Sequence, residues 1–495
     1  MELQNHEDKS VFAREYHTIN EQETSLVYDV ENTRLIQLSD LEWRVLETTR
    51  ENPASTSELK TRLPAQRPEK VAEAVDELIK VDMLGNTPSN KISPEQIADY
   101  ERKYLEKLRQ KKLMQISLNV THKCNLHCDY CYGEDGSYGR PAVNMSRETA
   151  RQAVDFLFKE NGDAERCRIT LFGGEPLLNF DLVKYVIQYA RKKASRLNKI
   201  IEFGLTTNGI LMDEEKAGFL INEKIEVTFS LDGPKKIHDQ NRPLKSNQER
   251  GSYDVIYPNI LKYIEKAEKD NSFYAFRATL TRPGIRDMCE MIDFFERFNT
   301  EKVIYDTAEY KHGMSPNGLA INDDDLLLYK QQVKEIAKKF VENKLKPVHN
   351  LFAGPFGVLK NKTKRHSHCM SAGVLYVGVS AEGDIYPCHR FVGYKETKLG
   401  DVRQGFDREK WLKGYSRIHI FNSKVCSSCW LRYYCGGLCP ATNYYLGGDM
   451  VLSDTVVPEP VHCRLKKIVF EEAMRLHYRL SKNGSNMIEY MNEGG

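Results

Sequence analysis

The sequence has no cysteine before position 124, no apolar run of about eighteen residues, and no marked excess of either charge sign. Its 72 lysines and arginines face 70 aspartates and glutamates, a net charge of +2 that excludes a strongly basic nucleic-acid binder. The missing apolar run excludes a transmembrane helix, so we expect no membrane partner. The first residues, MELQNHEDKS, hold no apolar stretch, so we expect no secretory signal peptide and a cytoplasmic location.

What the chain does contain is enough apolar material for several folded domains. It has 495 residues, of which 40% are hydrophobic and 10% aromatic. A chain of this length is expected to form two to four domains, and this composition excludes global disorder. We find no internal repeat and no low-complexity segment.

The twelve cysteines are unevenly placed. Three lie within 124–131 and seven between 369 and 463, whereas Cys167 and Cys289 stand apart. A large cytosolic chain does not need disulfides, so tight groups of cysteines indicate metal or iron–sulfur ligands. We expect the two isolated cysteines to be buried structural thiols.

The first ninety residues form one predicted unit. Two alternating runs, SLVYDV and RLIQL, flank Glu31-Asn32-Thr33 and predict a β-hairpin. Apolar-periodic helices follow from Ser39-Asp40, from about Ser55 and from about Pro68 to Val81. A winged-helix-like domain over residues 1–92 fits this pattern, and the charged helical stretch 93–112 is expected to be a linker.

From residue 113 onward, strands and helices alternate. The apolar run LMQISLNV precedes the first cysteines, and RITLFG, IIEFGLTT, IEVTFSLDG, YAFRATLT and KVIYDTAEY follow. This alternation predicts an α/β fold with a parallel sheet and right-handed crossovers, whose polar strand ends mark the site. Predicted helices cover residues 147–159, 180–194, 213–222, 254–268, 287–298 and 323–345. Residues 369–463 are instead rich in cysteine, glycine and tyrosine, typical of a cluster-stapled domain, and a last helix is predicted over 464–481.

The first cysteine group reads C-N-L-H-C-D-Y-C, at Cys124, Cys128 and Cys131. Three thiolates on one short loop can hold three irons of a cubane and leave the fourth iron open. An open iron can bind a small molecule through an amine and a carboxylate. A zinc site is the alternative, with His122 or His127 as the fourth ligand.

With these residues the sequence resembles the radical S-adenosylmethionine (SAM) superfamily. C-x3-C-x-aromatic-C after a strand is its signature, and Gly173-Gly174-Glu175-Pro176, Thr207-Asn208-Gly209 and Ser230-Leu231-Asp232-Gly233-Pro234 end the next three strands in order. The resemblance implies a partial (β/α)6 TIM barrel over 113–345 that binds SAM. It further implies SAM contacts from the backbone of Gly173, Gly174 and Glu175, from Tyr130 beside the adenine, and from Ser230, Asp232 and Arg242 around the carboxylate and ribose.

The second cysteine region resembles the SPASM domain of radical SAM peptide-modifying enzymes. Cys369 is followed by Gly383-x4-Cys388, then Cys426-x2-Cys429-x5-Cys435-x3-Cys439, and last Cys463. The resemblance implies a cysteine-rich C-terminal SPASM domain over 346–480, a tail over 481–495, and two auxiliary [4Fe–4S] clusters, three clusters in all. It assigns Cys426, Cys429, Cys435 and Cys463 to an outer cluster, and Cys369, Cys388 and Cys439 to an inner one.

Seven cysteines are one short of the eight that two fully ligated cubanes need. The inner cluster is therefore expected either to keep an open iron or to be completed by His389 or another residue. Sulfatase-maturing members of the family have an aspartate base after the corresponding cysteine, where this chain reads Pro387-Cys388-His389-Arg390. His389 is a candidate general base near neutral pH, or a structural residue.

The hairpin and helices before the core resemble the recognition element of enzymes that modify ribosomally made peptides (RiPPs). Such elements bind the precursor's leader as an added strand. A DNA-binding winged helix is the competing interpretation, but residues 40–62 carry only Arg44, Arg50, Lys60 and Arg62 as bases, a poor footprint for phosphate. A purely structural cap is the third possibility. We expect no nucleic-acid partner.

The combined resemblance predicts a maturase of a ribosomally synthesised precursor peptide. It implies SAM cleavage to a 5′-deoxyadenosyl radical, with flavodoxin or ferredoxin as electron donor. The product expected first is a thioether between a cysteine sulfur and a backbone or side-chain carbon, as in sactipeptide and ranthipeptide synthases. The alternatives are carbon–carbon or carbon–oxygen crosslinking, formylglycine formation in a sulfatase, and a non-enzymatic, zinc-stapled winged-helix regulator.

Overall fold

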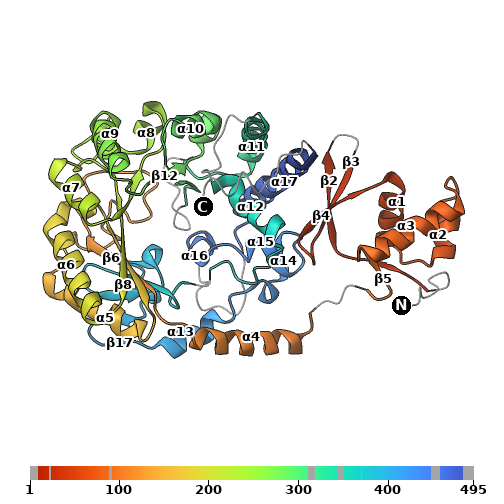
Figure 1. Cartoon of the computed structure of the whole chain (residues 1–495), viewed down its shortest axis with the longest axis horizontal. Helices are drawn as coiled ribbons and strands as arrows, with labels where there is room; N and C mark the ends of the chain where they lie inside the picture. The colour runs from red at the N-terminus through yellow and green to blue at the C-terminus, as the bar shows by residue number, and fades with distance from the viewer. Residues whose placement is uncertain are drawn as a thin grey trace.

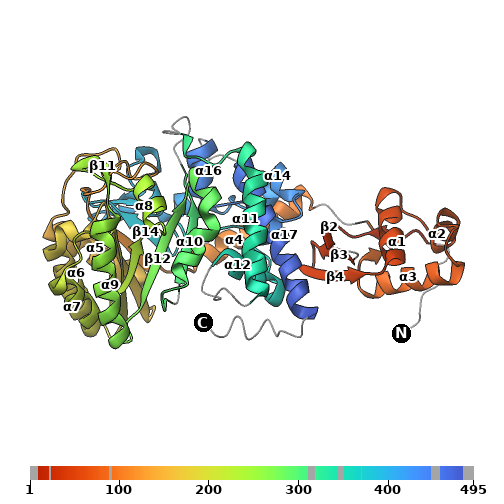
Figure 2. The same cartoon turned by 90° about the horizontal axis from the view of Figure 1, so that it is seen from above.

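The structure is a computed structural model that describes residues 9–21, 24–88, 92–300, 302–309, 318–342, 350–369, 371–447 and 458–482. Figure 1 shows an elongated molecule with the N-terminal helices at one end and the main sheet at the other. The cysteine-rich C-terminal elements lie between these two parts, as the view from above also shows (Figure 2).

The centre of the fold is a mixed sheet that has ten strands among the described residues. Six neighbouring strands are parallel and follow the chain in order, which confirms the predicted α/β alternation. They are β6 (Gln115–Thr121), β7 (Arg166–Gly173), β8 (Ile200–Thr207), β9 (Glu226–Ser230), β12 (Tyr274–Leu280) and β13 (Lys302–Thr307).

The C-terminal part extends this sheet, which the sequence did not predict. β14 (Tyr376–Val379) runs parallel to β6, and three antiparallel strands continue outward from it. These are β15 (Asp384–Tyr386), β16 (Gly400–Asp401) and β17 (Gly405–Phe406). The segment that carries Cys388 is thus joined directly to the strand that leads into Cys124.

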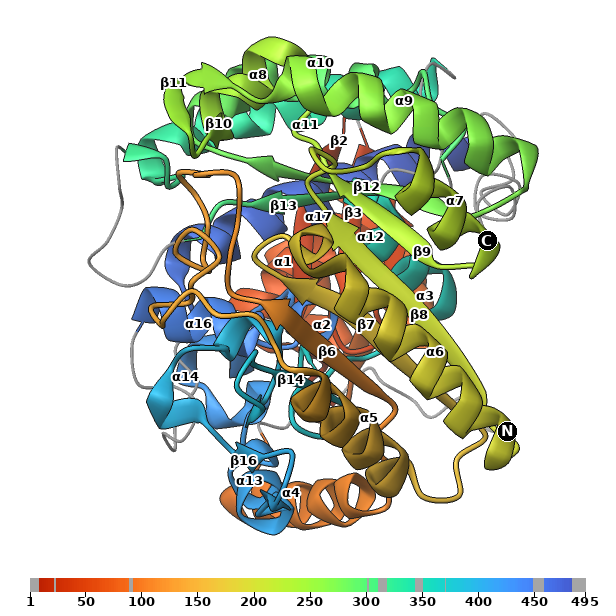
Figure 3. The same ribbon diagram turned by 90° about the vertical axis from the view of Figure 1, so that its left-hand side faces the viewer.

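Helices between the parallel strands bury one apolar face against the sheet. In α6 the fully buried side chains are Val183, Val186, Ile187 and Ala190, spaced for one helical face. Figure 3 shows α5 and α6 crossing the sheet on the same side. The helices of this part are α5 (Arg147–Asn161), α6 (Phe180–Arg196), α7 (Glu214–Asn222), α8 (Lys235–Asn241), α9 (Tyr253–Lys269), α10 (Met288–Phe295), α11 (Leu326–Val341) and α12 (Asn350–Asn361), with a small hairpin of β10 (Pro243–Leu244) and β11 (Asn247–Gly251).

The N-terminal unit is a three-stranded antiparallel sheet with three helices. The predicted hairpin is confirmed as β3 (Thr24–Asp29) and β4 (Arg34–Leu38), and the sequence missed its neighbour β2 (Tyr16–Glu21). Serine caps with a glutamate three residues later start two of the helices, as expected for capping boxes. The helices are α1 (Asp40–Glu51), α2 (Thr56–Arg62) and α3 (Pro68–Lys80), and β1 (Phe12–Ala13) pairs with β5 (Leu84–Gly85).

The stretch expected to be a linker forms α4 (Pro94–Arg109), which packs on the C-terminal part. Its Tyr104 and Leu108 share a buried cluster with Trp411 and Tyr415. The charged residues of this stretch led to the prediction of a linker, but two apolar residues four apart on one helix face are enough for this contact. The remaining helices are α13 (Arg408–Tyr415), α14 (Lys424–Ser427), α15 (Arg432–Cys435), α16 (Pro440–Gly447) and α17 (Pro460–Lys482).

The last helix α17, predicted over 464–481, packs against α11 and α12. Most of the predicted C-terminal tail, residues 483–495, lies outside the described residues. Among the helices of the described ranges, none combines the length and apolarity needed to span a bilayer.

Candidate functional site

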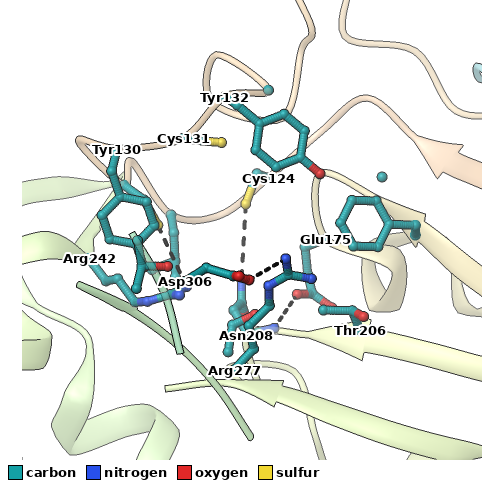
Figure 4. Close-up of a pocket in the computed structure, with 18 of the residues that line it drawn as sticks. Cys124, Tyr130, Cys131, Tyr132, Glu175, Thr206, Asn208, Arg242, Arg277 and Asp306 are labelled. Atoms are coloured by element: carbon teal, nitrogen blue, oxygen red, sulfur yellow. Dashed lines mark hydrogen bonds and ion pairs between the residues drawn. The ribbon is translucent and has the colours of Figure 1, made fainter. Parts of the chain in front are cut away.

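The first cysteine group lies in the loop that leaves β6. Cys124, Cys128 and Cys131 all line one cavity, together with residues from the ends of β7, β8, β9, β12 and β13 (Figure 4). The loop backbone is fixed to the α8 end, since His127 donates its backbone N–H to the carbonyl of Pro243 at 3.0 Å. The structure thus brings the three predicted ligands together at the carboxyl edge of the sheet, where α/β folds place their sites.

Burial changes the pKa values of the three cysteine thiols. It raises the pKa of Cys124 to about 12, and it raises the pKa values of Cys128 and Cys131 as well. Thiolates in such surroundings need a compensating cation, which the irons of a cluster supply. Within the described residues, no three His, Cys, Asp or Glu side chains are placed to share a single metal ion. In a cubane each cysteine binds a different iron, and this donor set of three thiols around one cavity fits such a cluster.

The two glycines after β7 allow the strand end to touch the cysteine loop. Gly174 donates its N–H to the Thr121 carbonyl at 3.0 Å, and Glu175 donates to the Lys123 carbonyl at 2.8 Å. A Cβ on Gly173 would lie 2.3 Å from the Thr121 oxygen, and one on Gly174 would lie 2.2 Å from the Lys123 oxygen. Close backbone contact with the loop therefore requires both glycines, which also line the cavity.

Glu175 is buried and bound to its own chain. Its carboxylate accepts hydrogen bonds from the Thr207 hydroxyl at 2.7 Å and from the Asn208 backbone N–H at 2.8 Å. Burial raises the pKa of Glu175 to about 7. The side chain thus ties the end of β7 to the end of β8, and the Nδ2 of Asn208 lies 3.9 Å from the Cys124 sulfur.

Asp232 binds two of the other predicted SAM-contact residues, Tyr130 and Arg242. Its carboxylate accepts from the Tyr130 hydroxyl at 2.7 Å, from Arg242 Nε at 3.0 Å and from the Thr279 backbone N–H at 2.9 Å. Arg242 also places Nη1 4.0 Å from the Cys128 sulfur and lies over the Tyr130 ring. Ser230, at the end of β9, lines the same cavity.

Two ion pairs in the cavity were not among the predicted site residues. Arg277 on β12 pairs with Asp306 on β13 at 2.5 Å, and Arg390 pairs with Glu309 just after β13. Figure 4 shows Arg277 and Asp306 pointing toward each other across the cavity. The sequence signal was position only, because Arg277 and Asp306 lie within the predicted strands YAFRATLT and KVIYDTAEY near the carboxyl edge of the sheet. Their pairing depends on the alignment of β12 with β13.

His389 does not line this cavity but lines a neighbouring one, which shares Phe172 and Arg277 with it. Its Nδ1 is 2.6 Å from the Tyr376 hydroxyl, and its ring packs between Phe172 and Tyr132. Burial, with Arg277 and Arg390 nearby, lowers the pKa of His389 to about 3. The side chain is therefore neutral at physiological pH, and one nitrogen is engaged within the chain.

The other seven cysteines form the two predicted groups. Burial and then Cys439 raise the pKa of Cys388 to about 12, with Cys369 also contributing. Burial and then Cys435, Cys426 and Cys429 raise the pKa of Cys463 to about 12. These mutual effects place Cys369, Cys388 and Cys439 in one neighbourhood, and Cys426, Cys429, Cys435 and Cys463 in another.

The inner group is linked to the first cavity through Arg390. Arg390 places Nη1 3.7 Å from the Cys439 sulfur and also lines the first cavity. Of the two isolated thiols, Cys167 is buried in the main core as expected, whereas Cys289 is only partly buried and lies 3.8 Å from the Gln332 carbonyl oxygen.

Comparison with known families identifies the part of the chain that holds the first cysteine group. Residues 118–267 match the model of the Radical SAM superfamily. These residues are similar to a radical SAM domain. The matched range includes Cys124 and Arg242 with the motifs between them, and it excludes the N-terminal unit and the seven later cysteines.

Curated relatives cover more of the chain. The radical SAM cyclopropyl synthase TigE of Paramaledivibacter caminithermalis is 22% identical over 83% of this chain and 86% of its own length. A cysteine-type anaerobic sulfatase-maturating enzyme of Clostridium novyi is 24% identical over 64% of this chain and 80% of its own. Both likenesses extend well beyond the radical SAM domain.

A solved structure shares the fold. The protein anSMEcpe, with bound AdoMet and the Cp18Cys peptide, superposes with a TM-score of 0.60 over 75% of this chain and 99% of its own. At 20% identity this likeness shows a common radical SAM α/β architecture. The chain is thus related to radical SAM enzymes, a family that uses SAM and a [4Fe–4S] cluster.

Proposed function

We propose that the chain is a radical SAM maturase of a ribosomally synthesised precursor peptide, with three [4Fe–4S] clusters. One observation carries the proposal: the cavity that Cys124, Cys128 and Cys131 line is also lined by Arg390, which contacts Cys439. Chemistry begun at the first group can therefore reach a substrate held near the second. The peptide bound in anSMEcpe supports a peptide substrate.

When bound, the first cluster and SAM supply a 5′-deoxyadenosyl radical that removes a hydrogen atom from the substrate. The chain orients the reactants. Asp232 fixes the Tyr130 hydroxyl and the Arg242 guanidinium, and Glu175 fixes Asn208 beside Cys124. These contacts are made within the folded chain, so the geometry is set before SAM arrives.

Other residues that line the cavity are suited to holding a peptide. Tyr132, Tyr138 and Phe172 provide apolar surface, whereas Arg277 and Glu309 provide charged groups. Aromatic walls exclude water from a reactive carbon, and charged groups fix a peptide's polar atoms. We propose that a substrate cysteine sulfur lies toward the Cys439 side, where the inner group has three cysteines for four irons.

The N-terminal sheet is the proposed leader site. In the described residues β4 pairs only with β3, so its other edge can accept a further strand. Helix α3 carries Glu69, Glu73, Asp76 and Glu77 against Lys70 and Lys80, which disfavours a DNA phosphate partner. Hydrogen exchange of residues 34–38 tests the assignment, since an added strand protects their amides and DNA does not.

The reaction is tested by mass spectrometry after co-expression with a cysteine-containing precursor encoded nearby. Each thioether removes two hydrogen atoms from the peptide and makes one thiol resistant to iodoacetamide. An unmodified peptide from the wild-type enzyme would contradict the proposal for that precursor. A variant with Cys124, Cys128 and Cys131 all changed to Ala is the matched control and leaves the peptide unchanged.

A second candidate, carbon–carbon bond formation, is favoured by the likeness to a cyclopropyl synthase. It removes the same two hydrogens but leaves every cysteine open to alkylation, so the same experiment separates the two. The sulfatase-maturating relatives favour formylglycine formation. That reaction converts a cysteine to an aldehyde, which a hydrazide probe detects.

A further inference from the structure

The N-terminal sheet and the loop of the outer cysteine group share one hydrophobic core. Ile19, Leu26 and Tyr28 of the sheet are buried together with Leu431 and Phe470. Cys426 is itself a buried member of this cluster, and Cys429 and Cys435 pack against it. Figures 1 and 2 both show β2 and β4 beside α17 and the neighbouring α14.

Trp430, the residue after Cys429, is the aromatic centre of this contact. The His17 ring of β2 stacks on it with centroids 3.8 Å apart and planes 3° apart. Tyr28 of β3 meets Trp430 edge-on at 6.2 Å and meets Phe470 of α17 at 5.3 Å. The sheet thus packs against the short segment between two of the proposed cluster ligands.

A buried arginine closes the contact. Arg432, only 5% exposed, binds both carboxylate oxygens of Glu15 at 2.6 and 2.7 Å and a carboxylate oxygen of Glu31 at 2.6 Å. On the neighbouring helix, Arg479 pairs with Glu21 at 2.6 Å. In the docked state, an Arg432 without its carboxylates would be a buried and unpaired cation, so removal of Glu15 and Glu31 is expected to destabilise the docked sheet.

We propose that the N-terminal sheet is a cap that holds the outer cluster-binding loop in its ligating shape, with Arg432 as the positioning residue. This inference rests on the proposed function in one respect, that Cys426, Cys429, Cys435 and Cys463 hold a cluster. Docking of the cap and binding of iron use the same loop, so each stabilises the other by linkage. A leader bound at β4 therefore acts on a sheet already coupled to the cluster.

The first test measures iron release to a ferrous chelator from the anaerobically reconstituted full-length chain. The double variant Glu15→Gln/Glu31→Gln strands the Arg432 charge, and we expect one cluster's iron to leave at least about tenfold faster than in the wild type. The exposed pair Lys70 and Glu73 on α3 offers the matched control, Lys70→Gln/Glu73→Gln, which leaves the rate unchanged. Equal rates in wild type and Glu15→Gln/Glu31→Gln would overturn the inference.

A rescue variant separates positioning from general damage. Adding Arg432→Met to the double variant removes the stranded charge but not the loss of the ion pairs, and we expect it to restore part of the slow release. No restoration would mean that Arg432 is not the coupling residue.

A second measurement stands even if the double variant fails to fold. Hydrogen exchange in residues 16–21 and 24–29 is compared between the reconstituted wild type and Cys463→Ser. We expect faster exchange in Cys463→Ser, since loss of the cluster loosens the cap. Equal exchange, with less iron bound, overturns the inference. Equal iron in both proteins would instead refute the proposed outer cluster, so the two failures are distinguishable.

Discussion

At the scale of single residues, Asp232 organises the proposed SAM site more than any motif glycine does. It is fully buried and accepts hydrogen bonds from Tyr130, Arg242 and the Thr279 backbone. The family resemblance gave it a place among the SAM contacts. In the structure the carboxylate oxygens of Asp232 bind groups of the chain itself, so Asp232 affects SAM through Tyr130 and Arg242.

Asp232→Asn keeps the shape of the side chain but leaves the buried Arg242 cation without its counter-charge. We expect 5′-deoxyadenosine formation to fall by about 10- to 100-fold, because the loop around Cys128 loses its fixed partner. The assay is SAM cleavage under dithionite. Asp254→Asn, which changes an exposed carboxylate paired with Lys235, is the control. Wild-type rates in Asp232→Asn would contradict the account of this network.

His238 gives a pH-dependent prediction. The Ser252 hydroxyl donates to the Arg242 carbonyl, so His238 Nε2 donates to Ser252, and Nδ1 is left to accept the Asp232 N–H. Burial, followed by the charge of Arg242, lowers the pKa of His238 to about 4. The folded chain then binds fewer protons than the unfolded chain between about pH 6.5 and 4, so this contribution to stability is lost as pH falls through that window.

The variant His238→Gln removes this titration. The stability advantage of wild type over the variant should shrink as pH falls from 7 toward 4, by up to about 3 kcal/mol in total. Unfolding midpoints of both proteins across this range provide the measurement. A constant difference would show that His238 is not held neutral by the fold.

At the scale of elements, the approach of the β7 end to the cysteine loop is the critical contact. Gly174→Ala puts a Cβ 2.2 Å from the Lys123 carbonyl oxygen, so the two segments must separate. We expect the first cluster to be lost while the other two remain, a fall of about four irons per chain. Iron analysis after reconstitution measures this.

Gly218 in α7 is the matched control, because a Cβ there meets nothing within 4 Å. Gly218→Ala is expected to keep all iron and to raise stability slightly, by about 0.5–1 kcal/mol. An unchanged iron content in Gly174→Ala would contradict the proposed role of the glycine.

The sequence predicted the elements whose signal is local. The six parallel strands and the β3–β4 hairpin have clear apolar patterns, and the C-x3-C-x2-C loop follows β6 as expected. Strand β2 was not predicted, because its sequence YHTINE is largely polar. Its side chains contact Arg479 and Trp430, which lie far along the chain. The sequence also did not predict the packing of α4 and the pair Arg277–Asp306, since both depend on contacts between distant segments.

In the candidate site too, some features could be predicted from the sequence and others could not. Spacing alone grouped Cys124, Cys128 and Cys131, which lie in one short loop, whereas the division of the seven later cysteines into two sets came from the family resemblance, because each set spans distant segments. The environment of His389 could not be predicted from the sequence, because its pKa of about 3 results first from burial and then from Arg277 on β12 and the adjacent Arg390. From the sequence alone, a histidine beside a ligand cysteine can be a base or a structural residue, and its surroundings distinguish the two.

At the scale of the whole molecule, the N-terminal sheet and the cysteine-rich C-terminal elements pack against each other. The N-terminal sheet packs on the outer cysteine loop, α4 packs near the inner group, and β14 extends the sheet of the radical SAM domain. A chain arranged in this way brings together three groups of cysteines and the strand edge that we propose binds the leader peptide. The central proposal is that the three cysteine groups hold separate clusters and that only the first cluster cleaves SAM.

One measurement tests that claim most directly: iron content and 5′-deoxyadenosine formation in the wild type and in a variant with Cys124, Cys128 and Cys131 all changed to Ala. The account predicts about twelve irons in the wild type and about eight in the variant, which produces no 5′-deoxyadenosine under dithionite. A wild type that saturates near four irons, or a variant that still cleaves SAM, would contradict it.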